Sequence, residues 1–556
     1  MRKFGLAAMF CAGVALAGCA STKGDSGTVA DARDISALPP PLPPRPPVLS
    51  PQPALDAGQS GNAGYASGKQ ESRIARPRLG YVPPVIIARP QGREQYDGKE
   101  VSPVKRASDE PVSTFSVDVD TGAYANTRRF LSAGRMPPRD GVRTEEMINY
   151  FRYDYARPDG QDMPFTVAAD IAQTPWNENT RLMRIGLRGY DLPRNSRPPA
   201  NLVFLLDVSG SMNSADKLPL VKTALSQFAG ELSSGDTVSI VVYAGAAGLV
   251  LEPTSDTRKI RNALESLSAG GSTAGGAGLK LAYQVAEDNF IKNGVNRVIL
   301  ATDGDFNVGV SDTKSLIELI ENKRDTGITL TALGFGTGNF NEAMMEQVAD
   351  HGNGNYAYID NALEARKVLS DEMQSTLFTI AKDVKIQVEF NPAVVSEYRL
   401  IGYENRALRE EDFNNDAVDA GDIGAGHQVT AIYEIVPAGS KGWLPDRRYD
   451  DPLPDTVRTR SAEAAHIKLR YKLPDGKTSR LTDLVVRSAD LQSPPPMRPD
   501  FAFATSVAAF GQKLRADPML QQFSYRDIEK LAGSQTDFWR QEFLRLNDLA
   551  AAMAGS

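Results

Sequence analysis

The stretch Asn201–Met212, NLVFLLDVSGSM, places an apolar run directly before three oxygen-bearing side chains. Its five consecutive apolar residues, Leu202–Leu206, predict a strand that is buried on both faces. Asp207, Ser209 and Ser211 then follow at alternate positions. A turn released from the end of a central strand can aim one carboxylate and two hydroxyls at a single point. Such all-oxygen ligands, few of them charged, are typical of a site for a hard cation.

Two later segments supply further oxygen donors. Thr273 lies in the glycine-rich loop GGSTAGGAG (Gly270–Gly278), which precedes a predicted helix. Asp303 follows a second predicted buried strand, Arg297–Ala301. Asp-x-Ser-x-Ser, then Thr, then Asp, in that order after strands, resembles the metal-ion-dependent adhesion site of von Willebrand factor type A domains, and all five positions match.

This resemblance implies a role for each of the five residues. Ser209 and Ser211 would bind the metal directly, Thr273 directly or through water, and Asp207 and Asp303 largely through waters and hydrogen bonds. The implied cofactor is Mg²⁺, which Mn²⁺ or Ca²⁺ can replace. One coordination position would stay open for a Glu or Asp carboxylate of a protein partner. The alternative is a turn that only caps the following helix with Ser and Asp oxygens.

Residues 198–378 alternate between apolar strands and helical patterns. This alternation predicts an α/β fold with a doubly wound, mostly parallel sheet that is covered by helices on both faces. Ligands of such sheets bind beyond the carboxyl ends of the strands, where Asp207 and Asp303 fall. The predicted strands are Leu202–Leu206, Thr237–Tyr243, Arg297–Ala301, Thr329–Phe335 and Asn355–Tyr358, and the predicted helices are Leu218–Leu232, Arg258–Leu267, Gly278–Asp288, Lys314–Arg324 and Asn341–Ala349.

The segments on either side of this region are rich in β patterns. Before it, two alternating segments, Pro164–Gln173 and Thr180–Tyr190, predict a β-hairpin. After it, four segments with period-2 alternation predict strands: Val384–Tyr403, His427–Ala438, Ala465–Leu473 and Ser479–Arg487. We expect the α/β domain to be flanked by these strands or inserted into one sandwich that they form. Helical periodicity from Asp500 to Gly555 predicts a packed helical cap, with a partner-binding tail as the alternative.

The N-terminus has the pattern of a bacterial lipoprotein signal. Arg2 and Lys3 precede an apolar stretch, and LAGC, Leu16–Cys19, fits a cleavage box in which Cys19 becomes lipidated. A plain signal peptide is the alternative. No later apolar run approaches the ~20 residues that span a bilayer, so we expect a chain that is anchored to a membrane without crossing it. Ala20 favours the outer membrane in a Gram-negative source, with the periplasmic or surface face left open.

These patterns divide the chain into five parts. We predict a signal peptide at 1–18, a Pro/Gly/Ser-rich tether at 19–94, an N-terminal α+β domain at 95–195, a type A domain at 196–378 and a C-terminal β-rich domain with terminal helices at 379–556. The dense prolines of Ala37–Pro53 favour extended polyproline II, which makes the tether a semi-rigid spacer.

Composition and motifs argue against several functions. A formal charge of −7 without a basic stripe excludes the pattern typical of nucleic-acid binding. The three histidines, His351, His427 and His466, are far apart in the sequence and form no H-E-x-x-H motif. Asp118 and Asp120 alternate on a predicted strand, and we interpret them as solvent-facing or helix-capping residues, with a paired-carboxylate site as the alternative.

The ordered region as a whole, from about Gln95 to Ala551, resembles the bacterial YfbK-like lipoproteins with a von Willebrand factor type A domain. The segments that carry the resemblance include EPVSTFSVDVDTGAYANTRRFL, EEMINYF, ATDGDFNVG and GAGHQVTAIYEIVP. The resemblance implies a non-enzymatic, metal-dependent adhesion or scaffolding protein of the cell envelope. The alternatives are a hydrolase or envelope-processing enzyme that uses the cation as Lewis acid, and a structural protein with a vestigial site.

Overall fold

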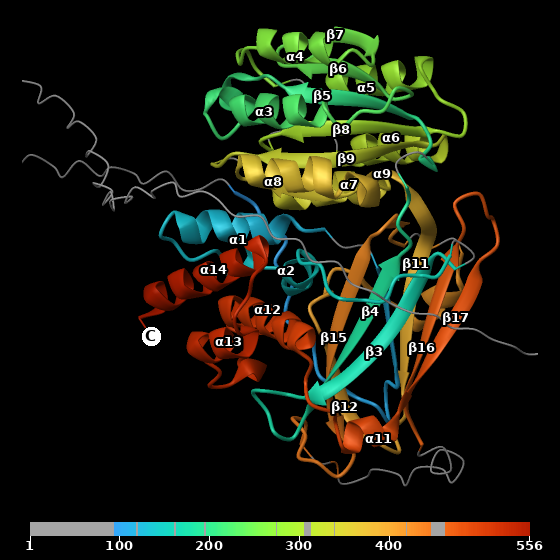
Figure 1. Cartoon of the computed structure of the whole chain (residues 1–556), viewed down its shortest axis with the longest axis vertical. Coiled ribbons are helices and arrows are strands. Elements are labelled where there is room, and N and C mark those ends of the chain that lie inside the picture. Colours follow the sequence, from blue (N-terminus) through green and yellow to red (C-terminus); the bar gives the residue numbers. More distant parts are fainter. Residues whose placement is uncertain are drawn as a thin grey trace, which may run out of the picture. The chain divides into compact units, whose positions relative to one another are not determined.

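The strand that precedes Asp207 lies in the middle of a six-stranded sheet in the computed structural model (Figure 1). This strand, β5 (Ala200–Asp207), pairs in parallel with β6 (Thr237–Tyr243) and β8 (Val295–Thr302). The structure describes residues 94–117, 120–160, 163–193, 196–273, 275–304, 313–338, 340–416, 418, 420–445, 447 and 462–555. Cys19, the signal peptide and the tether up to residue 93 lie outside the described residues.

The sheet runs in the order β10-β9-β8-β5-β6-β7, and its parallel strands confirm the predicted doubly wound fold. β9 (Ile328–Phe335) and β10 (Tyr356–Ile359) continue the sheet on one side of β8. On the other side lies β7 (Ala247–Thr254), which was not predicted from the sequence and pairs antiparallel with β6 at the edge. An edge strand is not buried on both faces, so β7 lacks the apolar run that identified the others.

Helices cover both faces of this sheet, because apolar side chains of β5 point alternately to opposite sides. Phe204 and Leu206 belong to one core cluster together with side chains of α3, α4 and α8. Val203 and Leu205 belong to another, with side chains of α5, α6 and α7. The helices are α3 (Leu218–Phe228), α4 (Thr257–Ser266), α5 (Gly275–Asp288), α6 (Thr313–Asp325), α7 (Glu342–His351) and α8 (Ala362–Arg366), followed by the π-helical η4 (Lys367–Asp371) and α9 (Met373–Leu377). α3 ends before the predicted Leu232.

Two further sheets are built from strands on both sides of the α/β domain. One has the order β1-β12-β15-β4-β3 and the other β13-β2-β11-β16-β17. Strands that precede residue 200 therefore pair with strands that follow residue 378, as expected for an inserted domain. The early strands are β1 (Lys105–Arg106), β2 (Val112–Ser116), β3 (Phe165–Gln173) and β4 (Arg181–Gly189); the late ones are β11 (Thr379–Phe390), β12 (Val395–Ile401), β13 (Ala407–Leu408), β14 (Ile423–Gly424), β15 (Gln428–Pro437), β16 (Glu463–Lys472) and β17 (Arg480–Arg487).

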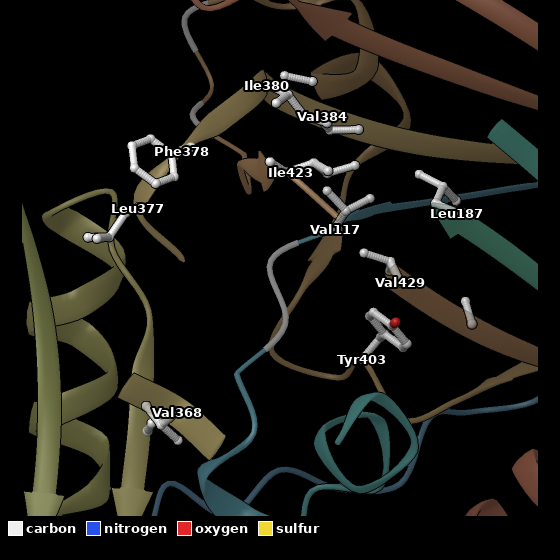
Figure 2. Packing of buried hydrophobic residues seen from close by; sticks show 14 of the residues in the cluster. Val117, Leu187, Val368, Leu377, Phe378, Ile380, Val384, Tyr403, Ile423 and Val429 are labelled. Atoms are coloured by element: carbon white, nitrogen blue, oxygen red, sulfur yellow. The ribbon is translucent and has the colours of Figure 1, made fainter. Parts of the chain in front are cut away.

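The inner faces of these sheets share one core. Figure 2 shows Leu187 of β4 and Val429 of β15 on one side of this core and Val384 of β11 on the other. Phe378 and Ile380 belong to the same cluster, so the core continues from the α/β domain into the two sheets. The predicted hairpin is present, since β3 and β4 pair antiparallel. The division of the chain at residues 195 and 378 stays a prediction.

The C-terminal helices form the predicted packed cap. α12 (Pro499–Arg515), α13 (Tyr525–Ala532) and α14 (Phe538–Ala554) bury apolar side chains against α1 (Gly122–Ser132) and α2 (Thr144–Asn149). The rings of Phe151, Phe503 and Phe543 meet edge to face, with Phe151 and Phe503 centroids 5.0 Å apart. The remaining short helices are η1 (Arg139–Gly141), η3 (Gly210–Asn213), η5 (Glu410–Asn414), α11 (Ser488–Gln492) and η6 (Pro518–Leu520). None of the helices described here is long and apolar enough to cross a membrane.

The interpretation of Asp120 as a solvent-facing or capping residue was wrong. Asp120 is only 2% exposed, and it pairs with Arg406 at 2.8 Å. Its carboxylate also accepts a hydrogen bond from the Tyr356 N–H at 2.7 Å, which ties the start of α1 to β10. Thr121, the N-cap residue of α1, makes no side-chain capping bond. Asp118 lies outside the described residues.

A buried charge network should contribute strongly to stability where the helical cap meets the sheet. Arg399 of β12 pairs with Glu434 of β15 and with Asp517, each at 2.8 Å, and all three side chains are at most 2% exposed. Arg399→Met leaves two carboxylates buried without their cation, and we expect it to lower the free energy of unfolding by about 3–5 kcal/mol. Urea denaturation measures this change.

The control for Arg399→Met is Arg487→Met, which removes an arginine that is 74% exposed and pairs with Asp490, itself 36% exposed. Water can solvate that carboxylate when the arginine is lost, so the control should unfold almost like the wild type. Equal effects of the two substitutions would contradict the importance of the buried network.

Candidate metal centre

The carboxylate of Asp207 is buried at the carboxyl end of β5 and is held from two sides. The Ser209 N–H donates to one oxygen at 2.8 Å, and the Thr302 hydroxyl donates to the other at 3.1 Å. Burial raises the pKa of Asp207 to about 6, and the charge of Asp303 acts in the same direction, while the bonds from Ser209 and Thr302 lower it. Thr302 is the last residue of β8, so the neighbouring parallel strand fixes the orientation of this carboxylate.

The two serine hydroxyls lie next to one another on the turn after β5. Ser209 Oγ is 3.0 Å from Ser211 Oγ, and between them the single turn η3 begins. Ser209 is buried, whereas Ser211 is exposed. Of the two residues, Ser211 therefore reaches the surface, next to the buried hydroxyl of Ser209.

Backbone hydrogen bonds tie the glycine-rich loop to this turn. The Gly210 N–H donates to the Gly271 carbonyl at 3.0 Å, and the Gly270 N–H donates to the Val208 carbonyl at 2.8 Å. Gly271 adopts a φ of +85°, a left-handed conformation that glycine takes at little cost. Thr273 follows two residues later and is 7% exposed. The loop therefore brings Thr273 to the same edge of the sheet as the two serines.

Asp303 lies at the carboxyl ends of the strands together with Lys217, a cation that was not predicted from the sequence. The ammonium of Lys217 lies 2.8 Å from Asp303 Oδ2, and the side chains are 7% and 0% exposed. The aliphatic part of Lys217 passes over Gly336, which has a φ of +72°; a Cβ at this position would lie 2.2 Å from Lys217 Cγ. Lys217 and Asp303 are 86 residues apart in sequence, and no local pattern signals their pairing.

The donor set fits a hard divalent cation. Its members are two carboxylates and three hydroxyls, which are the ligand types that Mg²⁺ takes when it keeps several waters. The described part of the chain contains no group of three or more His, Cys, Asp or Glu that could hold a metal ion. With Asp207, Asp303 and Lys217 ionised, the three side chains carry a net charge of −1. A bound divalent ion would leave a surplus positive charge for an acidic ligand.

The described histidines belong to other parts of the fold. His351 lies 2.8 Å from Glu321, and His466 lies 2.8 Å from Asp483. Burial lowers the pKa of His427 to about 4, and this residue lies at the start of β15 in the sandwich. None of the three contacts the serines or aspartates at the end of β5 in the hydrogen bonds of the described residues.

Comparison with known proteins gives matches over nearly the whole folded part. Family models described as "von Willebrand factor", "von Willebrand factor type A domain" and "Uncharacterized protein YfbK, C-terminal" match residues 90–184, 202–305 and 375–553. The Escherichia coli (strain K12) protein "Uncharacterized protein YfbK" is 46% identical over 478 residues, which cover 84% of this chain and 82% of that protein.

Solved structures give weaker similarities. A "von Willebrand factor type A" structure from Catenulispora acidiphila is 18% identical and covers 73% of this chain and 89% of its own, with a TM-score of 0.38. The "conserved hypothetical protein BatB" from Bacteroides thetaiotaomicron is 26% identical and covers 31% of this chain and 97% of its own, with a TM-score of 0.28.

The hydroxyl of Thr302 should be necessary for the stability of this edge. It donates to Asp207 and accepts a hydrogen bond from the Gly304 N–H at 3.2 Å. Thr302→Val keeps the shape but leaves both groups without this partner, and we expect the free energy of unfolding to fall by about 1–3 kcal/mol. Thr223→Val, on the exposed face of α3, is the matched control. A loss no larger than that of the control, in urea denaturation, would contradict this role of Thr302.

Proposed function

Because the chain belongs to the YfbK family of von Willebrand factor type A proteins, we propose that it is a non-enzymatic binding protein of the cell envelope. In this proposal, Asp207, Ser209, Ser211, Thr273 and Asp303 hold Mg²⁺, and the ion recognises a Glu or Asp carboxylate of a protein partner. Mn²⁺ or Ca²⁺ can take the place of Mg²⁺. Bound there, the ion supplies a Lewis-acidic position that an acidic group can occupy.

The observation that carries the proposal is the convergence of three separate loops at one edge of a buried sheet. The turn after β5 and the glycine-rich loop are joined by two backbone hydrogen bonds. The end of β8 joins them through the bond from Thr302 to Asp207. Five oxygen-bearing side chains thereby come from loops at one end of the sheet, where Ser211 is exposed, and the pair of Lys217 with Asp303 limits their negative charge.

Lys217 supports the choice of an acidic partner. Without Lys217, the carboxylates of Asp207 and Asp303 would carry a charge of −2 and would neutralise a divalent ion completely. With the ammonium of Lys217, the net charge of the three side chains is −1. The surplus charge of the loaded edge attracts carboxylates and repels cationic groups. A hydrolase would instead need a general base within reach of the ion. The described histidines lie elsewhere, and no observation favours the hydrolase.

We further propose that the protein is anchored through a lipid on Cys19. The support is the sequence LAGC at the end of an apolar stretch, with Ala20 after the cysteine favouring the outer membrane. The proline-rich tether that follows would separate the binding domain from the lipid surface. These residues precede the described part of the chain.

The first test measures metal binding by calorimetric titration of Mg²⁺ and Mn²⁺ into the full chain in detergent. We expect weak one-to-one binding that is lost in Asp207→Ala and in Ser209→Ala, because each removes an oxygen of the proposed set. Ser214→Ala is the matched control: Ser214 is exposed and bonds to Asp216, so its hydroxyl is outside that set. Circular dichroism checks that each variant keeps its fold.

Two results of this titration would reject the metal-dependent proposal. One is the same affinity in all four proteins, which would place the ion at another site. The other is no binding in the wild type when an acidic peptide is also present, since a partner's carboxylate would then have been supplied. Where the ion binds as expected, pull-down with and without a chelator measures whether partner binding depends on it.

The proposed anchor is tested by detergent phase partitioning of the chain expressed in a Gram-negative host. The wild type should enter the detergent phase and incorporate labelled fatty acid, whereas Cys19→Ser should do neither. Cys11→Ser is the control, because Cys11 lies within the stretch that cleavage would remove. Unchanged lipid labelling in Cys19→Ser would rule out this anchor and leave the metal-site proposal intact.

A further inference from the structure

We propose that a cleft at the amino ends of the α/β strands, opposite the candidate metal centre, binds the carboxylate of a small molecule. Arg297 would be the cation that pairs with this carboxylate. The cleft has a volume of about 440 Å³ and lies between the amino end of β8, residues 353–355 before β10, and the strands β11, β13 and β14. Cavities of roughly 300–1,000 Å³ hold small-molecule ligands in other proteins. Its lining includes Arg297, Asn353, Asn355, Thr379, Asn405 and Gly421.

Arg297 is a buried cation with one nitrogen left for a ligand. The residue is 3% exposed; its Nε donates to the Thr329 hydroxyl at 2.8 Å, and Nη1 donates to the Thr331 hydroxyl at 3.1 Å and to the Thr376 carbonyl. Within the described residues, Nη2 has no hydrogen-bond acceptor. Arg297 lines the cleft, and Nη2 is the guanidinium nitrogen that these hydrogen bonds leave for a ligand there.

The hydrogen-bond partners of Arg297 do not neutralise its positive charge. The three oxygens that accept its hydrogen bonds are all neutral. Burial lowers the pKa of Arg297 to about 10, with the charge of Asp422 opposing that fall, so the guanidinium stays protonated at neutral pH. A buried charge of this kind is stabilised when an anion comes to it. An anionic ligand bound to the guanidinium would therefore stabilise this buried charge.

The other charged groups of the cleft largely balance one another. Arg406 lies 2.7 Å from Asp350, and His351 lies 2.8 Å from Glu321. Arg324 lies 3.2 Å from Asp325. Asp422 lines the cleft near Arg297 without a hydrogen bond to it.

A carboxylate fits this environment better than a phosphate. Nη2 can donate to a carboxylate oxygen, and such a charge-assisted hydrogen bond is stronger than one between neutral groups. A phosphate dianion would need further cations, whereas the cleft also contains the carboxylate of Asp422, whose charge acts on Arg297. The amide side chains of Asn353, Asn355 and Asn405 supply neutral donors and acceptors for the remainder of the ligand. The ligand class is thus a small monocarboxylate that carries an amide or similar polar group.

This inference does not depend on the proposed metal site. Arg297 and Asp303 lie six residues apart along β8 and beyond it, which at ~3.3 Å per residue places them about 20 Å apart. The alternative for Arg297 is a purely structural role, in which it braces the Thr376 carbonyl where the chain leaves the α/β domain. That role uses Nη1 and gives no reason for ligand binding at Nη2.

The probe for this site is N-acetylglycine, which joins a carboxylate to an amide, and its neutral control is N-acetylglycinamide. Saturation-transfer NMR and calorimetry on the full chain in detergent measure binding. We expect N-acetylglycine to bind and the neutral amide and inorganic phosphate to bind at least tenfold more weakly. Arg297→Gln should weaken N-acetylglycine binding at least tenfold, because it removes the charge that the carboxylate meets.

A second variant keeps Arg297 and changes only the charge of the cleft. Asn353 lines the cleft with a φ of +46°, a conformation that Asp also tolerates, so Asn353→Asp adds a negative charge without a change of shape. It should weaken N-acetylglycine binding several-fold. The matched control is Asn293→Asp, at an exposed residue with a φ of +62° outside the cleft lining, which should bind like the wild type.

Several outcomes would overturn the inference. They are absence of N-acetylglycine binding to the folded wild type, equal binding of the neutral amide, tighter binding of phosphate, and unchanged binding in Asn353→Asp. If Arg297→Gln unfolds, the Asn353→Asp and Asn293→Asp pair still decides between a carboxylate site and a structural arginine.

Discussion

Two adjacent backbone N–H groups hold both ends of the α/β domain. The Ala425 N–H donates to the Phe378 carbonyl at 2.9 Å, where the chain leaves the domain, and the Gly426 N–H donates to the Tyr190 carbonyl at 2.8 Å, before the chain enters it. The Gly189 N–H also donates to the His427 carbonyl at 2.8 Å. A domain of this size can be inserted into a sandwich only if its ends lie close together, and this short segment fixes their separation.

The sandwich depends on this closure because its sheets combine strands that are distant in sequence. β2 and β11 pair with Ser116 opposite Lys385, and β4 and β15 pair with Arg181 opposite Ile435. Such pairings cost loop-closure entropy, which rises only slowly with the length of the intervening chain. Within the native structure, the folded α/β domain holds the two ends of this long insertion together, which shortens the effective loop that the paired strands close. The two ends of the α/β strands, where the two candidate sites lie, therefore belong to the same folded unit.

The sequence predicted the elements whose signal is local. The apolar run Leu202–Leu206 and the polar turn after it identify β5 and the candidate ligands without knowledge of the fold. The pairing of Lys217 with Asp303 and the burial of Asp120 could not be predicted in this way, because each depends on a partner far along the chain. β7 was missed for a related reason, since an edge strand is defined by its neighbour more than by its own apolar pattern.

The buried middle of β8 explains why polar chemistry collects at its two ends. Val298–Ala301 are almost completely buried and apolar, and a strand packed on both faces has no room for a polar group without a partner. Arg297 and Asp303 mark where this constraint ends: Asp303 pairs with Lys217, whereas Arg297 donates its hydrogen bonds only to neutral oxygens. At the carboxyl end of the strands, the carboxylate of Asp207 adds a negative charge beside the Lys217–Asp303 pair; at the amino end, the buried guanidinium is the charge that an anion would meet. The residues at the two ends of β8 therefore differ in charge, so a cation at the carboxyl end and an anion at the amino end are the ligands that they favour.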